Sequence, residues 1–288
     1  MPTLENFNTR NPVKGLIIGD SGTGKTGALA SLAIAGYKLR ILDYDKGVHP
    51  IVEAIQKAGK PEALKNVIYQ TMDDKYTVVA GRVSPRGVPE AFSRGLAMLD
   101  YWGPRSLPGA EDLGKPSEWG LDTVLVIDSL THMCNAALRL AQCLNKNSGE
   151  LKITQPEWGM AQNMVEQMLS LLYSGEFKTN VLVLAHISYI QGKEKLDAEG
   201  NPAGEIRGLP SALGTALPPK IPAYFNIMLQ MIRSGTGAHA KRYLTTVPSG
   251  VINTKSPILT GIPAQLPIET GLATYFNVAL GKDLGGKV

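Results

Sequence analysis

The sequence has few cysteines and lacks any long hydrophobic run, and each scarcity excludes a class of protein. The two cysteines, Cys134 and Cys143, have neither the spacing of a metal-binding pair nor that of a disulfide framework. We therefore expect two buried, reduced thiols. No apolar run approaches the roughly 18 residues that a membrane-spanning helix needs, and the first residues lack the pattern of a secretory signal. These absences predict a soluble protein of a reducing compartment.

The chain also lacks a strong excess of charge of either sign. Its formal net charge is +4, and charged residues make up 19% of the 288 residues. A balance this small does not by itself indicate a nucleic-acid partner, which would require a local basic surface. Hydrophobic residues make up 43%, which is enough to fill a core without disulfides or metals.

What the chain does have is a regular alternation of apolar strands and amphipathic helices. This order is typical of an α/β fold with a mostly parallel central sheet and helices on both faces. We expect one domain spanning residues 1–288. Strands are predicted at 13–18, 38–42, 67–70, 123–127, 181–185, 224–232 and 243–247, and helices at 26–35, 51–58, 89–101, 130–144 and 156–173.

Three stretches interrupt this alternation. Residues 103–120 are rich in proline and glycine and predict a surface loop or insertion. Residues 188–222 are long, mixed in charge and rich in glycine and proline, and we expect a mobile loop, because such loops are usually functional or disordered. The tail from residue 256 onward is weakly patterned, and no chemistry can be assigned to it.

The strongest motif is a phosphate-binding loop of the form G-x-x-x-x-G-K-[ST], which follows an apolar strand and precedes a helix, as its geometry requires. The motif is Gly19-Asp20-Ser21-Gly22-Thr23-Gly24-Lys25-Thr26, and we expect the adjoining Gly27 to contact the nucleotide as well. Glycines let the backbone N–H groups turn inward toward phosphate oxygens, and the helix adds its positive end. We expect Lys25 to reach the β- and γ-phosphates and Thr26 to ligate Mg²⁺. The motif therefore predicts binding of a nucleoside triphosphate, Mg·ATP being our first choice.

Acidic residues follow two of the predicted strands. Asp128 ends the apolar run 123–127, where a carboxylate would hold Mg²⁺ beside the phosphate loop. Asp128 could also cap the next helix, although we expect Ser129 to be the cap. No glutamate follows Asp128, so the residue that positions the attacking water must come from elsewhere. Asp43 and Asp45 are the two candidates, because strand ends on one edge of a parallel sheet converge on the ligand. An Asp-rich turn without a catalytic role is the alternative.

With these motifs in this order, the chain resembles RecA-like P-loop ATPases, in particular the short, single-domain members carried by bacteriophages. The resemblance spans about residues 13–232 and implies that Asp45, a shorter acid than the family's usual Glu, activates water. It implies that Asp128 binds Mg²⁺ and that His186, at the end of strand 181–185, senses the γ-phosphate. A histidine that only satisfies its own hydrogen bonds is the alternative for His186.

The resemblance also implies partners. Segment 188–222 lies where the family has a DNA-contacting loop, and Lys193, Lys195 and Arg207 are the candidate contacts to single-stranded DNA, although four acidic residues share the segment. Lys220, or Arg233 instead, would act on the nucleotide of a neighbouring subunit, which implies a homo-oligomer with nucleotide at subunit interfaces. If the protein is phage-encoded, the cytoplasm of a bacterial host is the expected location.

Three functions compete on these grounds. The first is a DNA-stimulated, Mg²⁺-dependent ATPase of phage recombination, annealing or replication. The second is a small-molecule kinase, which would need an arginine-rich lid, whereas Arg82, Arg86, Arg94 and Arg105 are dispersed. The third is a loader or binding protein that ATP switches with slow turnover. The tryptophans Trp102, Trp119 and Trp158 could stack on bases, but they are more simply explained as core or interface residues.

Overall fold

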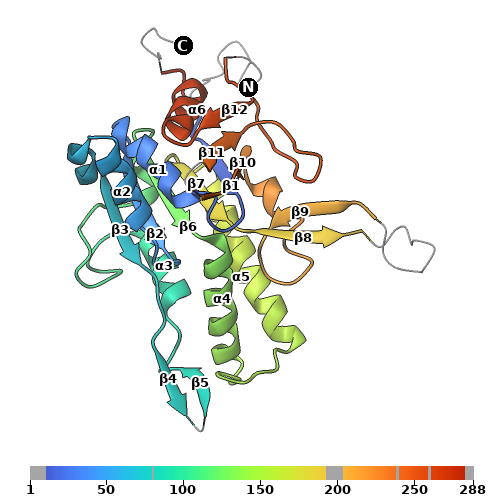
Figure 1. Cartoon of the computed structure of the whole chain (residues 1–288). Helices are drawn as coiled ribbons and strands as arrows, with labels where there is room; N and C mark the ends of the chain where they lie inside the picture. Colours follow the sequence, from blue (N-terminus) through green and yellow to red (C-terminus); the bar gives the residue numbers. More distant parts are fainter. Residues whose placement is uncertain (1–10, 80, 193–203, 238–239, 259–260, 283–288) are drawn as a thin grey trace, which may run out of the picture.

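The computed structural model describes residues 11–79, 81–192, 204–237, 240–258 and 261–282. An eight-stranded sheet runs through its centre in the order β12-β11-β10-β1-β7-β6-β2-β3 (Figure 1). The strands from β3 to β10 along this order are parallel, and β11 and β12 add antiparallel pairs at one edge. Their bounds are β1 Lys14–Ile18, β2 Lys38–Asp43, β3 Val67–Thr71, β6 Thr123–Asp128, β7 Asn180–Ala185, β10 Ile227–Ser234, β11 Lys241–Thr245 and β12 Gln265–Pro267.

Helices cover both faces of this sheet, which confirms the expected fold class. One face is covered by α1 Lys25–Ile34, α2 His49–Lys57 and α6 Gly271–Ala279, and the other by α3 Ala91–Asp100, α4 Leu130–Leu144 and α5 Gln155–Tyr173. Short 3₁₀ helices lie at Pro61–Asn66, Pro116–Glu118 and Ile221–Tyr224. Among the described residues, none of the helices is both long and apolar enough to cross a bilayer.

Alternating side chains explain why the sheet is buried on both sides. In β6, Val124 and Val126 join the buried cluster under α1, whereas Leu125 and Ile127 join the cluster under α4 and α5. Successive residues of a strand point to opposite faces, so a continuous apolar run is required where both faces are covered. This is why strand 123–127 could be recognised from sequence.

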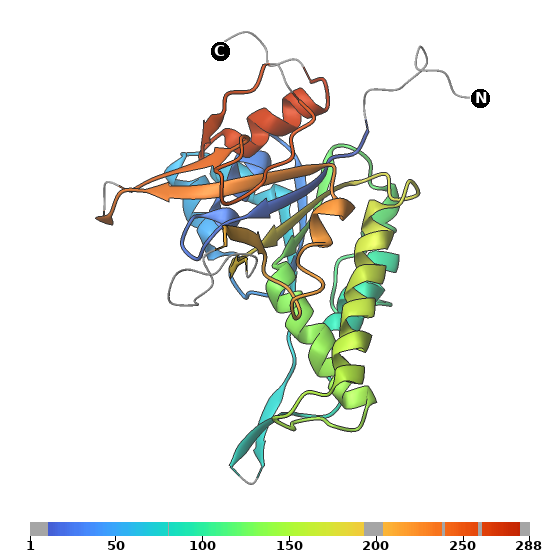
Figure 2. The same ribbon diagram turned by 90° about the vertical axis from the view of Figure 1, so that its right-hand side faces the viewer.

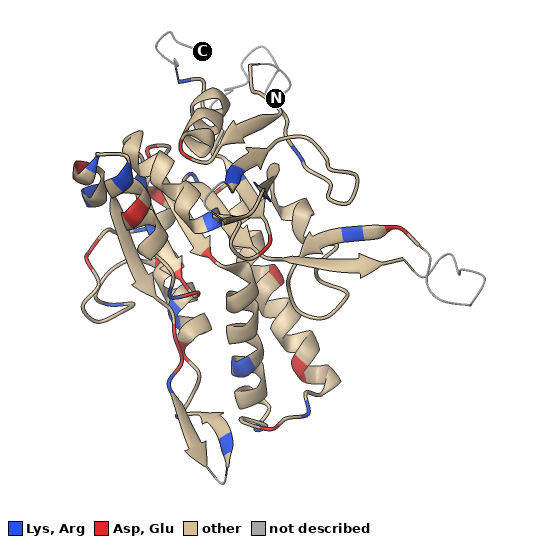
Figure 3. Ribbon diagram, in the orientation of Figure 1, with Lys and Arg blue, Asp and Glu red and all other residues tan. Residues whose placement is uncertain are grey.

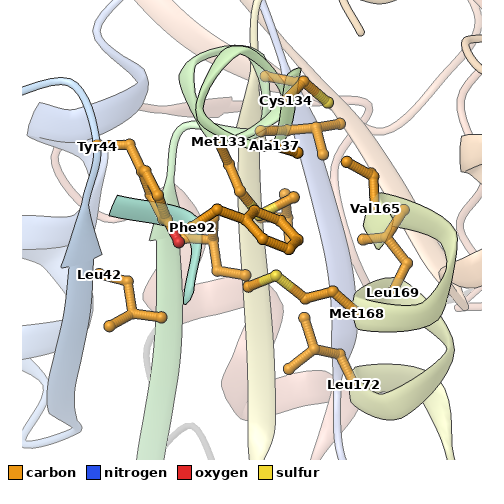
Figure 4. Close-up of a cluster of buried hydrophobic side chains, with 14 of the residues drawn as sticks. Leu42, Tyr44, Phe92, Met133, Cys134, Ala137, Val165, Met168, Leu169 and Leu172 are labelled. Atoms are coloured by element: carbon orange, nitrogen blue, oxygen red, sulfur yellow. The ribbon is translucent and has the colours of Figure 1, made fainter. Parts of the chain in front are cut away.

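The two longest helices, α4 and α5, pack side by side on one face of the sheet (Figure 2). Figure 4 shows Met133 and Ala137 of α4 and Met168 of α5 gathered around Phe92 of α3. Helix α4 has the bounds predicted from its apolar spacing. Cys134 is buried and unpaired in this layer, as expected, but Cys143 is only partly buried because it lies toward the exposed end of the helix.

The segment predicted as a loop at 188–222 contains regular structure instead, so that prediction is wrong in part. Strands β8 (Ile187–Gln191) and β9 (Ile206–Pro210) pair in antiparallel register, with Tyr189 opposite Gly208. A second antiparallel pair, β4 (Tyr76–Val79) and β5 (Arg82–Pro85), was not anticipated either. Both pairs are two-stranded sheets separate from the central one. β4, β5 and most of β8 are exposed or only partly buried on both faces, whereas Gly208 and Pro210 of β9 are buried.

The tail beyond residue 256 also has more structure than its sequence suggested. Helix α6 packs on α1 and buries Tyr275 and Phe276, and β12 lengthens the central sheet. Helix α6 is only nine residues long, which is too short for its apolar residues to show a clear helical period. Residues 103–120 form a loop as predicted, but the chain pairs across its base between Trp102 and Gly114. Trp102 is fully buried and stacks edge-to-face on Trp119. Trp119 and Trp158 are partly buried and pack against the same core, so all three lie in or against it.

Candidate functional site

The segment between β1 and α1 is a tight loop closed by its own backbone. Gly22 and Gly24 have φ angles of 76° and 92°, a region that glycine adopts without strain. The backbone N–H and the hydroxyl of Thr23 both donate to the carbonyl of Asp20, at 3.3 and 2.7 Å. Helix α1 begins at Lys25, directly after this loop. A curled backbone followed at once by a helix N-terminus is the geometry that binds phosphate.

Lys25 is buried at the base of this loop. Its Nζ donates to the carbonyls of Gly19 at 2.8 Å and Asp20 at 3.1 Å, and it lies 3.4 Å from Nδ1 of His186. Burial lowers the pKa of Lys25, while the nearby carboxylates of Asp128, Asp45 and Asp20 oppose this shift. Phosphate oxygens could replace the two carbonyl acceptors and would also compensate the charge that burial disfavours.

Thr26 and Asp128 meet across the sheet edge. The Thr26 hydroxyl donates to Oδ2 of Asp128 at 2.7 Å, although the two residues are 102 positions apart. Asp128 is buried, and burial raises its pKa to about 7, with the negative charges of Asp45 and Asp43 adding to the effect. A buried carboxylate whose charge is disfavoured is stabilised by a cation.

These two residues fit Mg²⁺ by the chemistry of their donors. Mg²⁺ prefers hard oxygen ligands and is usually held by one or two protein groups together with substrate phosphates. In the described residues, no group of three or more His, Cys, Asp or Glu side chains is arranged to hold a metal without other ligands. The pair is therefore suited to a metal that arrives with its nucleotide.

The two candidate acids after β2 have different surroundings. Asp43 is buried and accepts a hydrogen bond from the backbone N–H of Gly47, which closes the turn, and burial raises its pKa. Asp45 instead faces the start of α4. Its Oδ1 accepts bonds from the backbone N–H and the hydroxyl of Ser129, at 3.1 and 2.7 Å, and contacts His132. Asp45 is the acid that other polar side chains surround.

Burial alone would raise the pKa of Asp45, but the donors of His186, Ser129 and His132 outweigh it and lower the pKa. Asp45 is therefore an ionised hydrogen-bond acceptor at neutral pH. Ser129 stands at the N-cap position of α4, as predicted, but its side chain makes no capping bond. Its hydroxyl binds Asp45 instead, so the expected capping role of Ser129 is wrong. The peptide bond between Asp128 and Ser129 is cis.

Two histidines complete this cluster, and only one of them was a candidate from sequence. His186 follows β7 and lies between Lys25 and Asp45, with Nε2 3.8 Å from Oδ2 of Asp45. His132, on the first turn of α4, contacts the same carboxylate through Nδ1. Its ring lies edge-to-face with that of His186, the centroids 6.3 Å apart. His132 carries no motif that marks it in sequence.

Other sequence candidates lie apart from this cluster. Lys220 forms an ion pair with Glu166 of α5 at 2.7 Å and is exposed. Arg207 is an exposed residue of β9, 3.8 Å from Glu205. Lys193 and Lys195 fall outside the described residues. Figure 3 shows Lys and Arg positions on many separate elements, so the described cations do not by themselves define a nucleic-acid surface.

A cavity of about 570 Å³ lies beside the phosphate loop, between α1, α2 and the segment after β12. Gly24, Gly27 and Pro50 line it together with Arg242 and Ile268. Pockets of this size hold small organic ligands, and this one is continuous with the loop through its glycines, so it can accommodate the base and sugar of a nucleotide.

The tip of the phosphate loop is held from two sides. Arg242 of β11 donates through Nε to the carbonyl of Gly22 at 3.1 Å. Arg233, directly opposite Arg242 in the β10–β11 pair, also lies near Gly22. On the other side, the hydroxyl of Tyr189 in β8 donates to Oδ2 of Asp20 at 2.9 Å. Ser21 is exposed between these contacts. Sequence reasoning missed Arg242 and Tyr189, because both come from segments distant in the chain.

Comparison with known proteins agrees with this geometry. The sequence pattern of a family described as an AAA domain matches residues 11–258. Among curated proteins, none matches the sequence. The family match and the sheet order, in which β7 separates the phosphate-loop strand β1 from the Asp128 strand β6, make the fold a RecA-like P-loop fold.

Similar solved structures include flagellar accessory protein FlaH from Methanocaldococcus jannaschii, at 10% identity and a TM-score of 0.35, covering 82% of this chain and 78% of that one. Another is a KaiC-like protein from Pyrococcus horikoshii, at 11% identity and a TM-score of 0.38, covering 83% and 86%. At these scores nothing about function follows from either structure.

Proposed function

The chain belongs to the AAA-domain family, a family of P-loop ATPases, and we propose that it hydrolyses Mg·ATP while acting on single-stranded DNA. One observation carries the proposal. Lys25, the Thr26–Asp128 pair and the ionised Asp45 converge at the carboxyl edge of the parallel sheet, next to a cavity of nucleotide size. Ligands of open α/β sheets bind at this edge.

Each residue has a separate role in this proposal. The loop backbone and Lys25 bind the β- and γ-phosphates and counter the charge that develops as the terminal phosphoryl group leaves. Thr26 and Asp128 would hold Mg²⁺, which supplies further charge neutralisation on the phosphate oxygens. Asp128 would stay ionised with that cation present, because opposite charge favours the ionised form of a carboxyl group.

Asp45 orients the attacking water. Its Oδ1 is occupied by Ser129 and His132, whereas in the part of the chain that the structure describes Oδ2 faces the more distant His186. Oδ2 is therefore the oxygen available to accept a hydrogen bond from water. Because its neighbours lower the pKa of Asp45, the carboxylate accepts a hydrogen bond from the water and orients it but does not retain the proton of the water. That proton leaves with the phosphate product.

The β8–β9 ribbon supports the assignment of DNA as the partner. It starts one residue after His186, and its Tyr189 contacts Asp20 of the phosphate loop. Tyr189, Ile190 and Arg207 are exposed on it. Aromatic rings and cations on an exposed ribbon can bind bases and phosphates without sequence preference. The proposed contact at Lys193 and Lys195 belongs to the same connection, outside the described residues.

The proposal includes a homo-oligomer in which Lys220 or Arg233 acts on a neighbouring subunit's nucleotide. Lys220 is exposed, and its ion pair with Glu166 is a surface pair of the kind that costs little to exchange. A phage role in recombination, annealing or replication, inside a bacterial cytoplasm, is the biological setting that we propose.

The test is phosphate release from Mg·ATP with and without single-stranded DNA over a range of salt concentrations. We expect DNA to stimulate turnover and salt to remove the stimulation steeply, because contacts to the DNA backbone release counterions and this release is less favourable at high salt. Turnover that DNA does not change would contradict the DNA assignment, and an absence of any Mg²⁺-dependent turnover would contradict ATP hydrolysis.

A switched loader with slow turnover is the second candidate, favoured by the environment of Asp45. An aspartate held by several donors is a weak base. Hydrolysis would then be slow, and the function would depend on nucleotide binding. DNA or protein capture that persists with a non-hydrolysable ATP analogue would favour this case. A kinase is less well supported, because Arg82, Arg94 and Arg105 each pair with an acidic residue rather than forming a lid.

A further inference from the structure

A histidine outside every recognised motif contacts the carboxylate that we assign to the attacking water. His132 is the third residue of α4, and its Nδ1 meets Oδ1 of Asp45. The contact joins residues 87 positions apart. The same Oδ1 also accepts both donors of Ser129. One oxygen of Asp45 is thus surrounded, while its other oxygen faces His186 at 3.8 Å.

The contact defines which ring nitrogen of His132 carries the proton. An ionised carboxylate only accepts hydrogen bonds, so Nδ1 of His132 must be the donor. His186 has the opposite arrangement. Its Nδ1 faces the ammonium of Lys25, which only donates, so this nitrogen accepts and Nε2 carries the proton toward Asp45. Asp45 therefore lies between two imidazoles, each directing an N–H at a different carboxylate oxygen.

The exposed position of His132 leaves two explanations. The His132 side chain is 49% exposed and that of Asp45 is 20% exposed, so the contact could be a surface ion pair of little consequence. Against this, Asp45 sits on a turn between β2 and α2, and among the described residues Ser129 is the other neighbour that donates to its Oδ1. Ser129 holds one side of the carboxylate, and without His132 the group could rotate about its last bond.

We propose that His132 is a positioning residue for ATP hydrolysis: by donating from Nδ1 to Oδ1 of Asp45, it keeps Oδ2 aimed at the attacking water. The inference rests on the proposed function, and it adds a residue from α4 to the site. A displacement of about 1 Å in a positioned group can lower a rate about 100-fold, so a small side chain motion is sufficient for the effect.

Kinetics of three variants test the role. His132→Phe removes the donor and should lower kcat about 10- to 100-fold while the KM for ATP changes less than about two-fold. His132→Asn places an amide N–H where Nδ1 was and should keep most of kcat, whereas His132→Gln places it near the position of Nε2 and should behave like Phe. His49→Asn is the matched control, because His49 is exposed and pairs with Glu53 on the surface of α2.

Equal kcat for His132→Phe and wild type would overturn the proposal, and so would equal losses in the Asn and Gln variants. A change confined to the KM for ATP would also overturn it. Thermal unfolding of each variant separates a folding defect from a catalytic one, and the Asn–Gln contrast decides the case even if the Phe variant is unstable.

A second measurement does not depend on hydrolysis. Imidazole ¹⁵N–¹H correlation spectra report the tautomer of each histidine, and we expect His132 protonated at Nδ1 in the wild type. Asp45→Ala should remove this signature, because it takes away the oxygen that accepts the hydrogen bond from Nδ1. His132 protonated at Nε2 would overturn the inference. If the wild-type protein hydrolysed no ATP, the proposed function would fail, and the spectra would still show whether the His132–Asp45 contact exists.

Discussion

Two antiparallel ribbons extend from the central sheet, and their contacts differ (Figures 1 and 2). The β4–β5 ribbon touches the connection between α4 and α5, where Arg82 pairs with Glu150 and Gly149 packs against Ser84. The β8–β9 ribbon continues directly from β7 and contacts the phosphate loop through Tyr189. Only the second ribbon, among the described residues, has a polar contact with the nucleotide site.

Exposed large side chains occur on both ribbons, including Tyr189 and Ile206 on β8–β9. Val78 and Val83 face each other across the β4–β5 ribbon and are 71% and 65% exposed. Tyr76 and Pro85 lie on the same face, because alternate residues of a strand share a side. An exposed apolar ribbon by itself is therefore not a sign of coupling to the site. The β8–β9 ribbon is linked to the site by one hydroxyl–carboxylate bond and by the covalent connection to β7.

The largest effect on ATP turnover should come from disabling the nucleotide site itself, which the β8–β9 ribbon contacts. Lys25→Ala removes the buried ammonium from the phosphate loop and should lower ATP turnover about 1,000-fold, with or without DNA. Phosphate release measures the loss, and circular dichroism should show an intact fold. Turnover near the wild-type rate would mean that nucleotide binds elsewhere.

The next largest effect should be on stability, at the base of the β4–β5 ribbon. Asp74 is buried and accepts bonds from the backbone N–H groups of Glu90 and Ala91 and from Nε of Arg139, each at 2.8 Å. Asp74→Ala leaves Arg139 without its partner and should lower the free energy of unfolding by about 3–5 kcal/mol. Urea unfolding measures it, while ATP affinity should hold. Loss of ATP affinity in a folded variant would couple this ribbon to the site.

A matched pair of tyrosines tests the comparison itself. Tyr189→Phe removes the hydroxyl that binds Asp20. The DNA stimulation of turnover should change about five-fold, which corresponds to the free energy of one net hydrogen bond. Tyr76→Phe makes the same chemical change on the β4–β5 ribbon and should change nothing. The two variants are compared in one turnover assay. Equal effects at both positions would remove the distinction between the ribbons.

The smallest effect is expected on the exposed face of β4–β5. Val78→Thr together with Val83→Thr keeps the β-branched shape and should change the free energy of unfolding by less than about 0.5 kcal/mol per site. Turnover should also be unchanged. A loss of several kcal/mol in urea unfolding would show that another part of the protein, or a second copy, covers this face.

Sequence reasoning worked where local chemistry determines structure. The phosphate loop needs its glycines and Lys25 in a fixed order, and β6 needs an unbroken apolar run because both its faces are covered. Helix α4 showed its full length through the spacing of its buried residues. Each of these features is determined by residues that are neighbours in the sequence.

The remainder depended on contacts between distant segments. No motif marks His132 in the sequence, and the turn after β2 is what brings Asp45 to it. Ser129 was expected to cap α4, but a neighbouring carboxylate competes successfully for its hydroxyl. The β8–β9 ribbon has glycine at 208 and proline at 210, which predict a loop locally, yet pairing with its partner strand holds it extended.

The place of β7 in the sheet has a mechanical consequence. This strand is flanked by β1 and β6 along its whole length, five register pairs on each side, and the chain leaves it through His186 straight into β8. Because ladder hydrogen bonds run across the strands, tension applied to the ribbon along the axis of β7 would load both ladders in shear, all bonds at once. A force applied to the ribbon by a bound polymer would therefore be transmitted to the middle of the sheet. His186, beside Lys25, joins β8 to β7 and would be the first residue to be displaced.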